Sequence, residues 1–195
     1  LSQQGGVNAV QLAALIQVSY KTAWTILHKI RRAINEAESR RKLTGFVQAG
    51  LMHYGSPNLQ PFTRHPQEHA IIVAQGSGEE DRPAIKLVRM PWRFFEQKNF
   101  ITREGDRYFR TRYLREDAFY PGLIGKFQLY WFPHLKEAFR QAKRWMNRTF
   151  HGIGAKYQQL YWDEFCFRWN LFMNWIPVER ELTALCVRPH DRSVA

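Results

Sequence analysis

The spacing of hydrophobic residues near the start of the chain predicts two helices joined by a short turn. Across residues 8–38, apolar side chains recur every three or four positions, which is the period of a helix with one buried face. Val18 and Ser19 interrupt this run, and a serine there can accept a hydrogen bond from a free amide of the next helical turn. The second helix is therefore predicted to begin at Tyr20. Its apolar face consists of Ala23, Trp24, Ile26, Leu27, Ile30 and Ile34.

These two helices have the outline of a helix-turn-helix, a motif whose second helix enters the major groove of DNA. The residues that would read bases lie at the start of that helix and are Tyr20, Lys21, Thr22 and Thr25. Gln17 stands where such turns commonly have glycine, which costs about 1 kcal/mol if the residue needs positive φ. An ordinary helical hairpin is the alternative interpretation.

The middle of the chain alternates in the manner of β-structure, and its end returns to helical spacing. Three strands are predicted, at residues 44–54, 70–75 and 84–90. Two helices are predicted after them, at residues 133–147 and 156–174. Between these groups, residues 92–120 interleave arginine with aromatic rings. That segment suits either a nucleic-acid groove or a core-facing set of rings whose arginines reach water.

The charge of the chain points to a polyanionic partner. Its formal net charge is +12, and such an excess repels itself unless an anion relieves it. Nucleic acid is the expected partner, and Lys29, Arg31 and Arg32 continue the predicted reading helix as candidates for phosphate contacts. No basic amphipathic stretch with an aromatic face favours a membrane surface. The two isolated cysteines suit neither a zinc site nor a disulfide framework, so a reducing cytoplasm is expected.

Two longer stretches resemble the ISXO2-like transposases of the IS1595 group of bacterial insertion sequences. Residues 7–34 (VNAVQLAALIQVSYKTAWTILHKIRRAI) are similar to the family's helix-turn-helix. Residues 143–170 (KRWMNRTFHGIGAKYQQLYWDEFCFRWN) are similar to its closing block, which joins a Lys-Arg pair and a Thr-His-Gly loop to a helix of pattern YxDEFxFRxN. The resemblance covers about residues 7–174, with the middle aligned loosely. The zinc ribbon that usually precedes the family's helix-turn-helix is missing, which is consistent with truncation.

The resemblance implies an α/β fold in which a helix-turn-helix module, residues 1–42, precedes a ribonuclease-H-like domain, residues 43–176, with a mixed sheet flanked by helices. Residues 177–195 are expected to form a weakly ordered tail. The implied partner is double-stranded DNA, in particular the ends of a transposon. The implied location is the nucleoid of a bacterial cytoplasm, and the protein could form a homo-oligomer on the DNA. In the family a carboxylate triad holds two Mg²⁺ or Mn²⁺ ions, which activate the attacking oxygen and stabilise the leaving oxygen.

The residues at the triad positions depart from the family's pattern. Gly50 occupies the place of the first acid and has no side chain with which to bind a metal. Glu104 is the nearest match to the second acid. Gln141 is the match to the third position, and Glu137 lies one helical turn before it. Losing a bridging carboxylate removes several kcal/mol of transition-state stabilisation, on the order of a thousandfold in rate. We therefore expect the cleavage chemistry to be lost and no cofactor to be bound.

The last candidates for DNA contact lie in the closing block and are Lys143, Arg144 and His151. His151 could equally hold its own loop in place. Three hypotheses follow from the sequence. The first is an inactive transposase remnant that binds DNA. The second is an active enzyme with displaced ligands, Glu104 or Asp106 together with Glu137 around one metal. The third is a basic interaction protein that reuses the fold as a scaffold.

Overall fold

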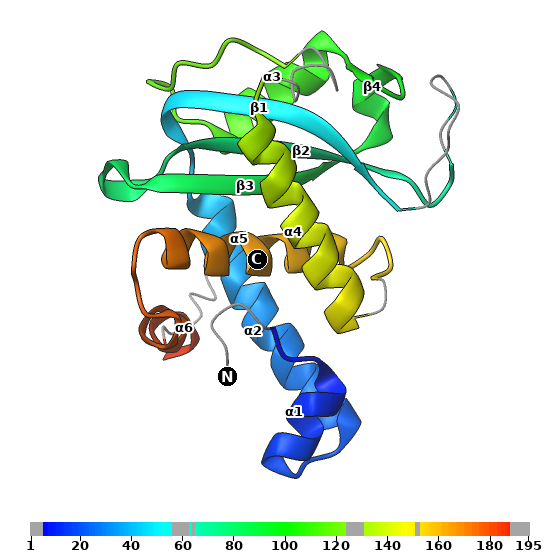
Figure 1. Ribbon diagram of the computed structural model, residues 1–195, viewed down its shortest axis with the longest axis vertical. Coiled ribbons are helices and arrows are strands. Elements are labelled where there is room, and N and C mark those ends of the chain that lie inside the picture. Colours follow the sequence, from blue (N-terminus) through cyan, green and yellow to red (C-terminus); the bar gives the residue numbers. More distant parts are fainter. Residues whose placement is uncertain (1–5, 56–62, 64, 124–130, 151–152, 188–195) are drawn as a thin grey trace, which may run out of the picture.

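The structure, a computed structural model, describes residues 6–55, 63, 65–123, 131–150 and 153–187. Figure 1 shows a small sheet with helices around it and a helix pair that protrudes from the body. The helices are α1 (Ala9–Ile16), α2 (Tyr20–Arg40), α3 (Arg103–Tyr113), α4 (Pro133–Phe150), α5 (Gln158–Met173) and α6 (Val178–Val187). The strands are β1 (Thr44–Tyr54), β2 (His69–Ser77), β3 (Pro83–Met90), β4 (Phe95–Gln97) and β5 (Phe100–Ile101). Within the described ranges, every helix is too short or too polar to cross a membrane.

The main sheet is antiparallel, with β2 between β1 and β3. The run from Ala70 to Ala74 in β2 is fully buried, because helices cover both faces of this central strand. Beyond β1, residues 114–119 run parallel to it through bridges from Leu43 to Leu114 and from Phe46 to Phe119. The sheet is therefore extended by a parallel segment. All three predicted strands are confirmed, as are the helices predicted in the last third of the chain.

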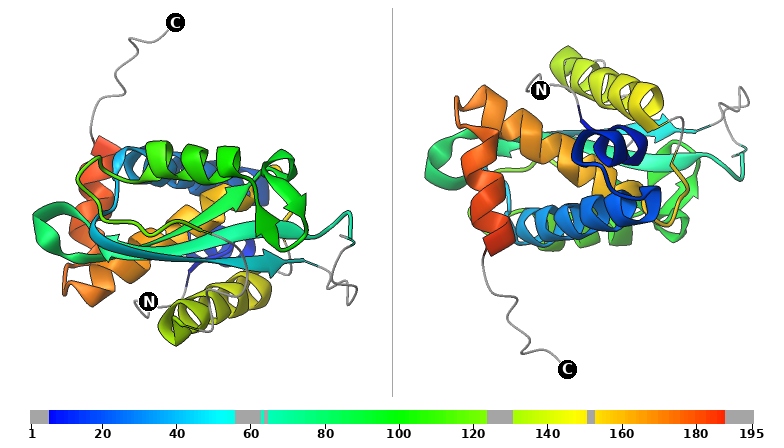
Figure 2. Two further views of the ribbon diagram at one scale, coloured as in Figure 1. Left: turned by 90° about the horizontal axis from the view of Figure 1, so that it is seen from above. Right: turned by 90° about the horizontal axis from the view of Figure 1, so that it is seen from below.

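Helices lie on both faces of this sheet. On one face, α4 and α5 pack against a core that includes Tyr54, Ile71 and Val73. On the other face, Phe109 of α3 belongs to a separate core with Ile72. Successive residues of β2 thus enter opposite cores, as the two-residue period of a strand requires. Figure 2 (left) shows α3 and α4 on opposite sides of the strands.

The long helix α2 links the protruding pair to the body. Its C-terminal half packs along α5, and Ile34 shares a small core with Phe167. Leu182 of α6 packs against the same core. The expectation of a weakly ordered tail is therefore wrong for residues 178–187, because the apolar side chains of α6 meet an apolar surface of α2 and α5.

The protruding helices begin where side-chain chemistry provides a cap. Asn8 accepts from the Gln11 amide at 2.9 Å, and the Gln11 side chain accepts from the Asn8 amide at 3.1 Å. Ser19 Oγ accepts from the Thr22 amide at 3.1 Å, and α2 begins at the predicted residue. Gln17 ends α1 in the left-handed region, with φ 54° and ψ 48°. The turn therefore does require the backbone conformation that favours glycine.

Candidate nucleic-acid interface

A polar stripe runs along the exposed side of α2. Its members are Lys21, Thr22, Thr25, Lys29 and Arg32, all of them exposed. They lie on one side of the helix because steps of three or four residues return to the same face. The Thr25 hydroxyl donates to the Lys21 carbonyl at 2.9 Å, so its oxygen remains able to accept. The structure thus places five of the ten predicted DNA-binding residues in one row, with cations at both ends.

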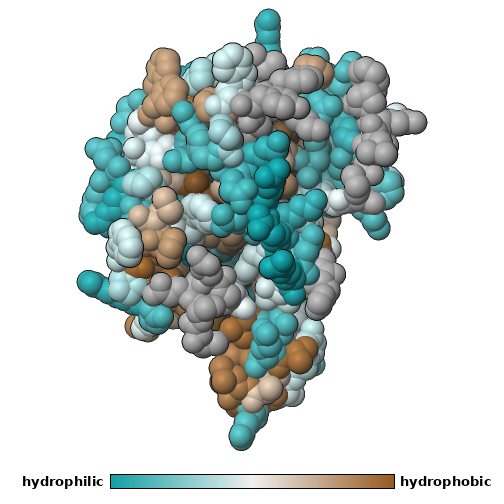
Figure 3. Space-filling model, viewed as in Figure 1, coloured by the Kyte–Doolittle hydropathy of each residue, from teal (hydrophilic) through white to brown (hydrophobic). Residues whose placement is uncertain are grey.

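Hydrophobic side chains gather at the free end of the α1–α2 pair, where Figure 3 shows a cluster of apolar residues. α1 buries none of its residues. The large exposed apolar residues here are Val10, Leu15, Ile16, Tyr20 and Trp24. We call this set the apolar tip. Tyr20, which was predicted to read bases, therefore belongs to the apolar tip and is followed directly by Lys21 of the polar stripe.

Arg31 lies away from the predicted interface. Its side chain is only 3% exposed, and its Nε donates to the Glu164 carboxylate of α5 at 2.7 Å. The guanidinium also lies 4.2 Å from the centre of the Tyr161 ring. The prediction that Arg31 contacts DNA phosphates is therefore wrong, because its charge is buried and paired inside the body. The sequence contained a signal for this, since Arg31 falls between Leu27 and Ile34 on the apolar side of the helix.

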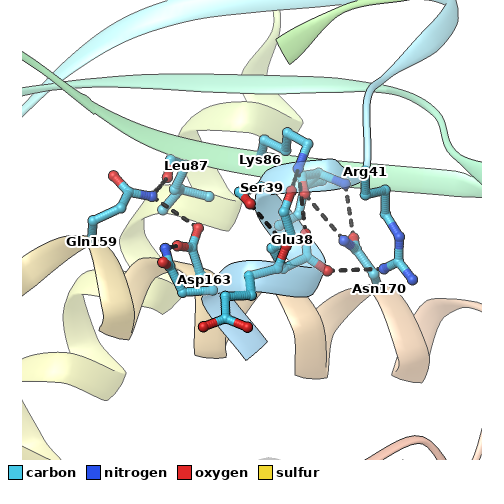
Figure 4. A network of polar contacts seen from close by, with 11 residues as sticks. Glu38, Ser39, Arg41, Lys86, Leu87, Gln159, Asp163 and Asn170 are labelled. Carbon is cyan, nitrogen blue, oxygen red and sulfur yellow. Dashed lines mark hydrogen bonds and ion pairs between the residues drawn. The ribbon is translucent and has the colours of Figure 1, made fainter. Parts of the chain in front are cut away.

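A network of buried polar groups fixes α2 to the body, as Figure 4 shows. The Lys86 ammonium of β3 donates to the Glu38 carbonyl at 2.7 Å and lies 3.4 Å from the Glu38 carboxylate. On α5, the Asp163 carboxylate accepts hydrogen bonds from Asn35 of α2 and from Gln159, the latter at 2.8 Å. These contacts join α2, β3 and α5 at the base of the protruding pair.

Residues that match the family's helix pattern YxDEFxFRxN form much of this network. Burial raises the pKa of the Asp163 carboxyl to about 7, while the hydrogen bonds from Asn35 and Gln159 act in the opposite direction. Asn170 accepts from the Ile85 amide at 2.8 Å and donates to the Ile85 carbonyl at 3.1 Å. It thereby replaces a neighbouring strand at the free edge of β3. In this structure, these motif residues hold elements together.

The outer side of α4 is a second basic surface, and Figure 3 shows strongly hydrophilic side chains along this helix. Lys143 and Arg144 are exposed there. Arg144 lies 3.0 Å from the Glu137 carboxylate, and Arg140 lies 3.5 Å from it. Lys143 is thus available to an anion, whereas Arg144 is partly neutralised. His151, the remaining candidate of this block, lies outside the described residues.

The positions of the first and third acids share one face of the sheet. Gly50 is paired with Val73, which belongs to the core beneath α4, so a side chain at position 50 would face α4. Glu137 lies near the start of α4, and the Gln141 amide donates to its carboxylate at 3.4 Å. Position 50 and α4 thus belong to the same face of the sheet, but Gly50 contributes no carboxylate, Gln141 is exposed, and two arginines pair with Glu137.

Glu104 lies in a different layer of the molecule. It is in the first turn of α3, which packs through Phe109 on the face opposite α4. Asp106 accepts from the Tyr120 hydroxyl at 2.8 Å in that same layer. The structure does not bring the three candidate ligands of this hypothesis together, because the sheet separates Glu104 and Asp106 from Glu137. Among the described residues, no group of three or more His, Cys, Asp or Glu is arranged to hold a metal.

The arginine-rich aromatic segment, residues 92–120, faces the core with part of its rings. Phe94 and Phe109 are buried, and Tyr108 stacks on Phe94 with ring centres 4.9 Å apart. Arg107 and Arg110 are exposed on the same helix. The buried rings fit the core-facing interpretation, whereas Phe119 is 66% exposed and does not.

Comparison with known proteins adds no relative. No family model matches the chain, and no curated protein and no solved structure matches it. The resemblance to ISXO2-like transposases therefore remains a prediction that depends on the residues quoted for it.

Proposed function

We propose that this chain binds duplex DNA through the α1–α2 pair, and that it descends from ISXO2-like transposases whose strand-cutting chemistry it has lost. The observation that carries the DNA-binding part is the polar stripe of α2. It places Lys21, Lys29 and Arg32 on one exposed side of a helix whose first half protrudes from the body. Such a helix can enter a major groove with its first turns against bases and its later cations against phosphates.

The sheet supports the inferred ancestry. Three antiparallel strands are followed by helix α3 and by a segment parallel to β1, with helices on both faces. A mixed sheet flanked by helices is the arrangement that the ribonuclease-H-like domain of the family would have. We infer the fold from this strand order and from the closing block.

The inferred loss of strand cleavage is supported by the lack of carboxylate charge at the position expected for two metal ions. A two-metal site needs carboxylates that compensate the cations and fix their spacing. Gly50 supplies none, and Glu137 is already paired with Arg140 and Arg144. Glu104, the nearest match to the second acid, lies on the face of the sheet opposite α4. DNA binding without cleavage is therefore the activity we propose.

Fluorescence anisotropy with a labelled duplex tests the proposal. Two phosphate contacts from Lys29 and Arg32 give a slope of about −1.8 in log affinity against log salt. Affinity should therefore fall about twelvefold between roughly 50 and 200 mM salt. An affinity that does not change with salt would exclude this mode of binding.

Paired substitutions separate sequence reading from phosphate contact. Replacing Lys21 and Thr22 by Ala should reduce discrimination between a selected site and random duplex. Replacing Lys29 and Arg32 by Ala should instead weaken binding to both and reduce the salt slope by about 2. Arg180→Ala, on exposed α6, removes a charge elsewhere and serves as the control. Equal loss of specificity from both double variants would contradict the assignment.

A second candidate function, contact with another copy of the chain, is favoured by the apolar tip. Leu15 is 62% exposed and Val10 is 65% exposed on a helix that buries nothing. Exposed apolar clusters of this kind mark contact surfaces. Sedimentation of the protein on DNA should show more than one copy per site, and Leu15→Glu should reduce the complex to one. A single copy in both cases would exclude this function.

A further inference from the structure

Three arginines lie in a row on the exposed side of α3. Arg103, Arg107 and Arg110 are exposed, whereas Phe109 of the same helix packs into the core. Steps of four and then three residues place the three side chains on one face of the helix. Among the described residues, none of the three has an ion pair or a side-chain hydrogen bond. We call this set the arginine row.

The arginine row is unfavourable for the helix that carries it. Like charges three or four residues apart on a helix repel each other. Arg103 is also the first residue of α3, where the positive end of the helix dipole disfavours a cation. Glu104 is exposed on the same helix but forms no ion pair with these described arginines, and Asp106 accepts from the Tyr120 hydroxyl and the Leu123 amide. A bound anion would relieve the repulsion that remains.

The arginine row continues the surface that carries the polar stripe of α2. Arg40, near the end of α2, is exposed like Arg32 two turns earlier, and an exposed acid, Glu36, lies between them in sequence. Immediately after α2, the Lys42 ammonium donates to the Thr111 carbonyl of α3 at 3.0 Å. Both views of Figure 2 show α2 and α3 on the side of the molecule opposite α4. Cations therefore follow one side of the molecule from the predicted reading helix to α3.

A long polyanion is needed to contact both surfaces. An α-helix rises 1.5 Å per residue, so Arg40 lies about 28 Å along α2 from Lys21. A duplex rises about 3.4 Å per base pair, and this distance therefore corresponds to about eight base pairs. Duplex DNA carries phosphates along its whole length, and it is the polyanion that the polar stripe is proposed to bind. The DNA that reaches α3 would be the part beyond the bases that α2 reads.

We propose that the arginine row of α3 is a second surface for duplex DNA, which holds the phosphates of the duplex where it continues beyond the bases read by α2. This inference rests on the proposed DNA binding by the α1–α2 pair. Contacts to phosphates fix the position of a duplex but carry no sequence information. The arginine row therefore adds affinity and salt dependence, and it leaves the choice of sequence to α2.

Fluorescence anisotropy with two duplexes centred on the same selected site tests the proposal. One has about 12 base pairs and extends about 20 Å to either side of its centre, whereas the other has about 30 base pairs and extends about 51 Å. In the full chain, Arg103→Gln with Arg107→Gln should leave the affinity for the short duplex unchanged. On the long duplex, the same pair should make the salt slope shallower by about 1.8, since two phosphate contacts are lost.

The two duplexes separate the failure of this proposal from the failure of the proposed function. An unchanged salt slope of the double variant on the long duplex would overturn the second surface while leaving binding by α2 intact. Equal weakening on both duplexes would also overturn it, because the short duplex does not extend to α3. A wild-type chain that binds neither duplex would instead refute the proposed function.

Matched variants assign the effect to charge at the arginine row. Arg103→Lys with Arg107→Lys should keep the salt slope, because a lysine ammonium also binds phosphate. Arg82→Gln with Arg180→Gln removes the same charge from two exposed residues outside this surface and should keep it as well. An equal reduction by this control pair would assign the effect to net charge and overturn the proposal. The melting temperature of the Arg103→Gln and Arg107→Gln variant should not fall, since neither arginine has an ion pair to lose and glutamine suits a helix.

Discussion

Replacing Arg31 by Met is expected to lower the free energy of unfolding by about 3 kcal/mol, whereas replacing the adjacent Arg32 should lower it by less than about 0.5 kcal/mol. Both residues carry the same charge on the same helix. Arg31 is buried against Glu164 at 2.7 Å, and Arg32 is exposed on the polar stripe. The two substitutions therefore remove the same charge from two very different environments.

The magnitude follows from the contacts of the pair. Removing one partner of a buried ion pair costs roughly 3–5 kcal/mol, because the other charge is left without compensation. Two observations place Arg31 at the lower end. Glu164 keeps Arg168 as a partner at 3.1 Å, and the Arg31 Nη2 atom makes no hydrogen bond within the described structure, so its desolvation is partly uncompensated already. For a chain of this size, about 3 kcal/mol corresponds to a melting temperature lower by about 6–12 °C.

Urea unfolding followed by far-ultraviolet circular dichroism measures the stability of both variants, and anisotropy measures their affinity for duplex DNA. Arg32→Met should keep its stability and show a salt slope shallower by about 1. Arg31→Met should keep the salt slope under conditions where it is folded. Adding Glu164→Leu to Arg31→Met should recover much of the lost stability, since no unpaired carboxylate remains. A stable Arg31→Met variant with a reduced salt slope would refute the reasoning.

Three further outcomes are expected. Gln17→Gly should raise the free energy of unfolding by about 1 kcal/mol in urea titration, because the residue has φ 54°, and an unchanged midpoint would show that the strain is relieved elsewhere. Asp163 has a pKa of about 7 in the folded protein, against an ordinary value of 3.8. Between these two values the folded state binds more protons than the unfolded state. The contribution of Asp163 to the free energy of unfolding therefore falls as pH rises, by at most about 1.4 kcal/mol per pH unit. Asp163→Asn should flatten this part of the stability profile, and an identical profile in the variant would assign the slope to another group. Gly50→Asp should not give metal-dependent cleavage of a labelled duplex, because Glu137 is paired with arginines and Glu104 lies on the other face of the sheet. Cleavage by this variant would show that fewer carboxylate ligands suffice.

Local patterns predicted the elements well because each was decided by near neighbours. Ser19 starts α2 through a bond to an amide three residues away, and the apolar runs of β2 and β3 correspond to strands buried on both faces. The positive φ at Gln17 was also foreseeable, because a two-helix turn this short needs a left-handed residue. The candidate site was predicted in part, since the exposed polar stripe of α2 follows from helical spacing alone.

Long-range packing decided what the local pattern could not. The sequence by itself determined that Arg31 is a cation on a helix, and only the approach of α5 made it a buried partner of Glu164. Likewise, Glu104 and Glu137 are both acids near helix starts, and the sheet between α3 and α4 sets them on opposite faces. The charge and spacing of residues are properties of the sequence. The burial of a side chain and its contacts are decided only when residues distant in sequence pack together and exclude water.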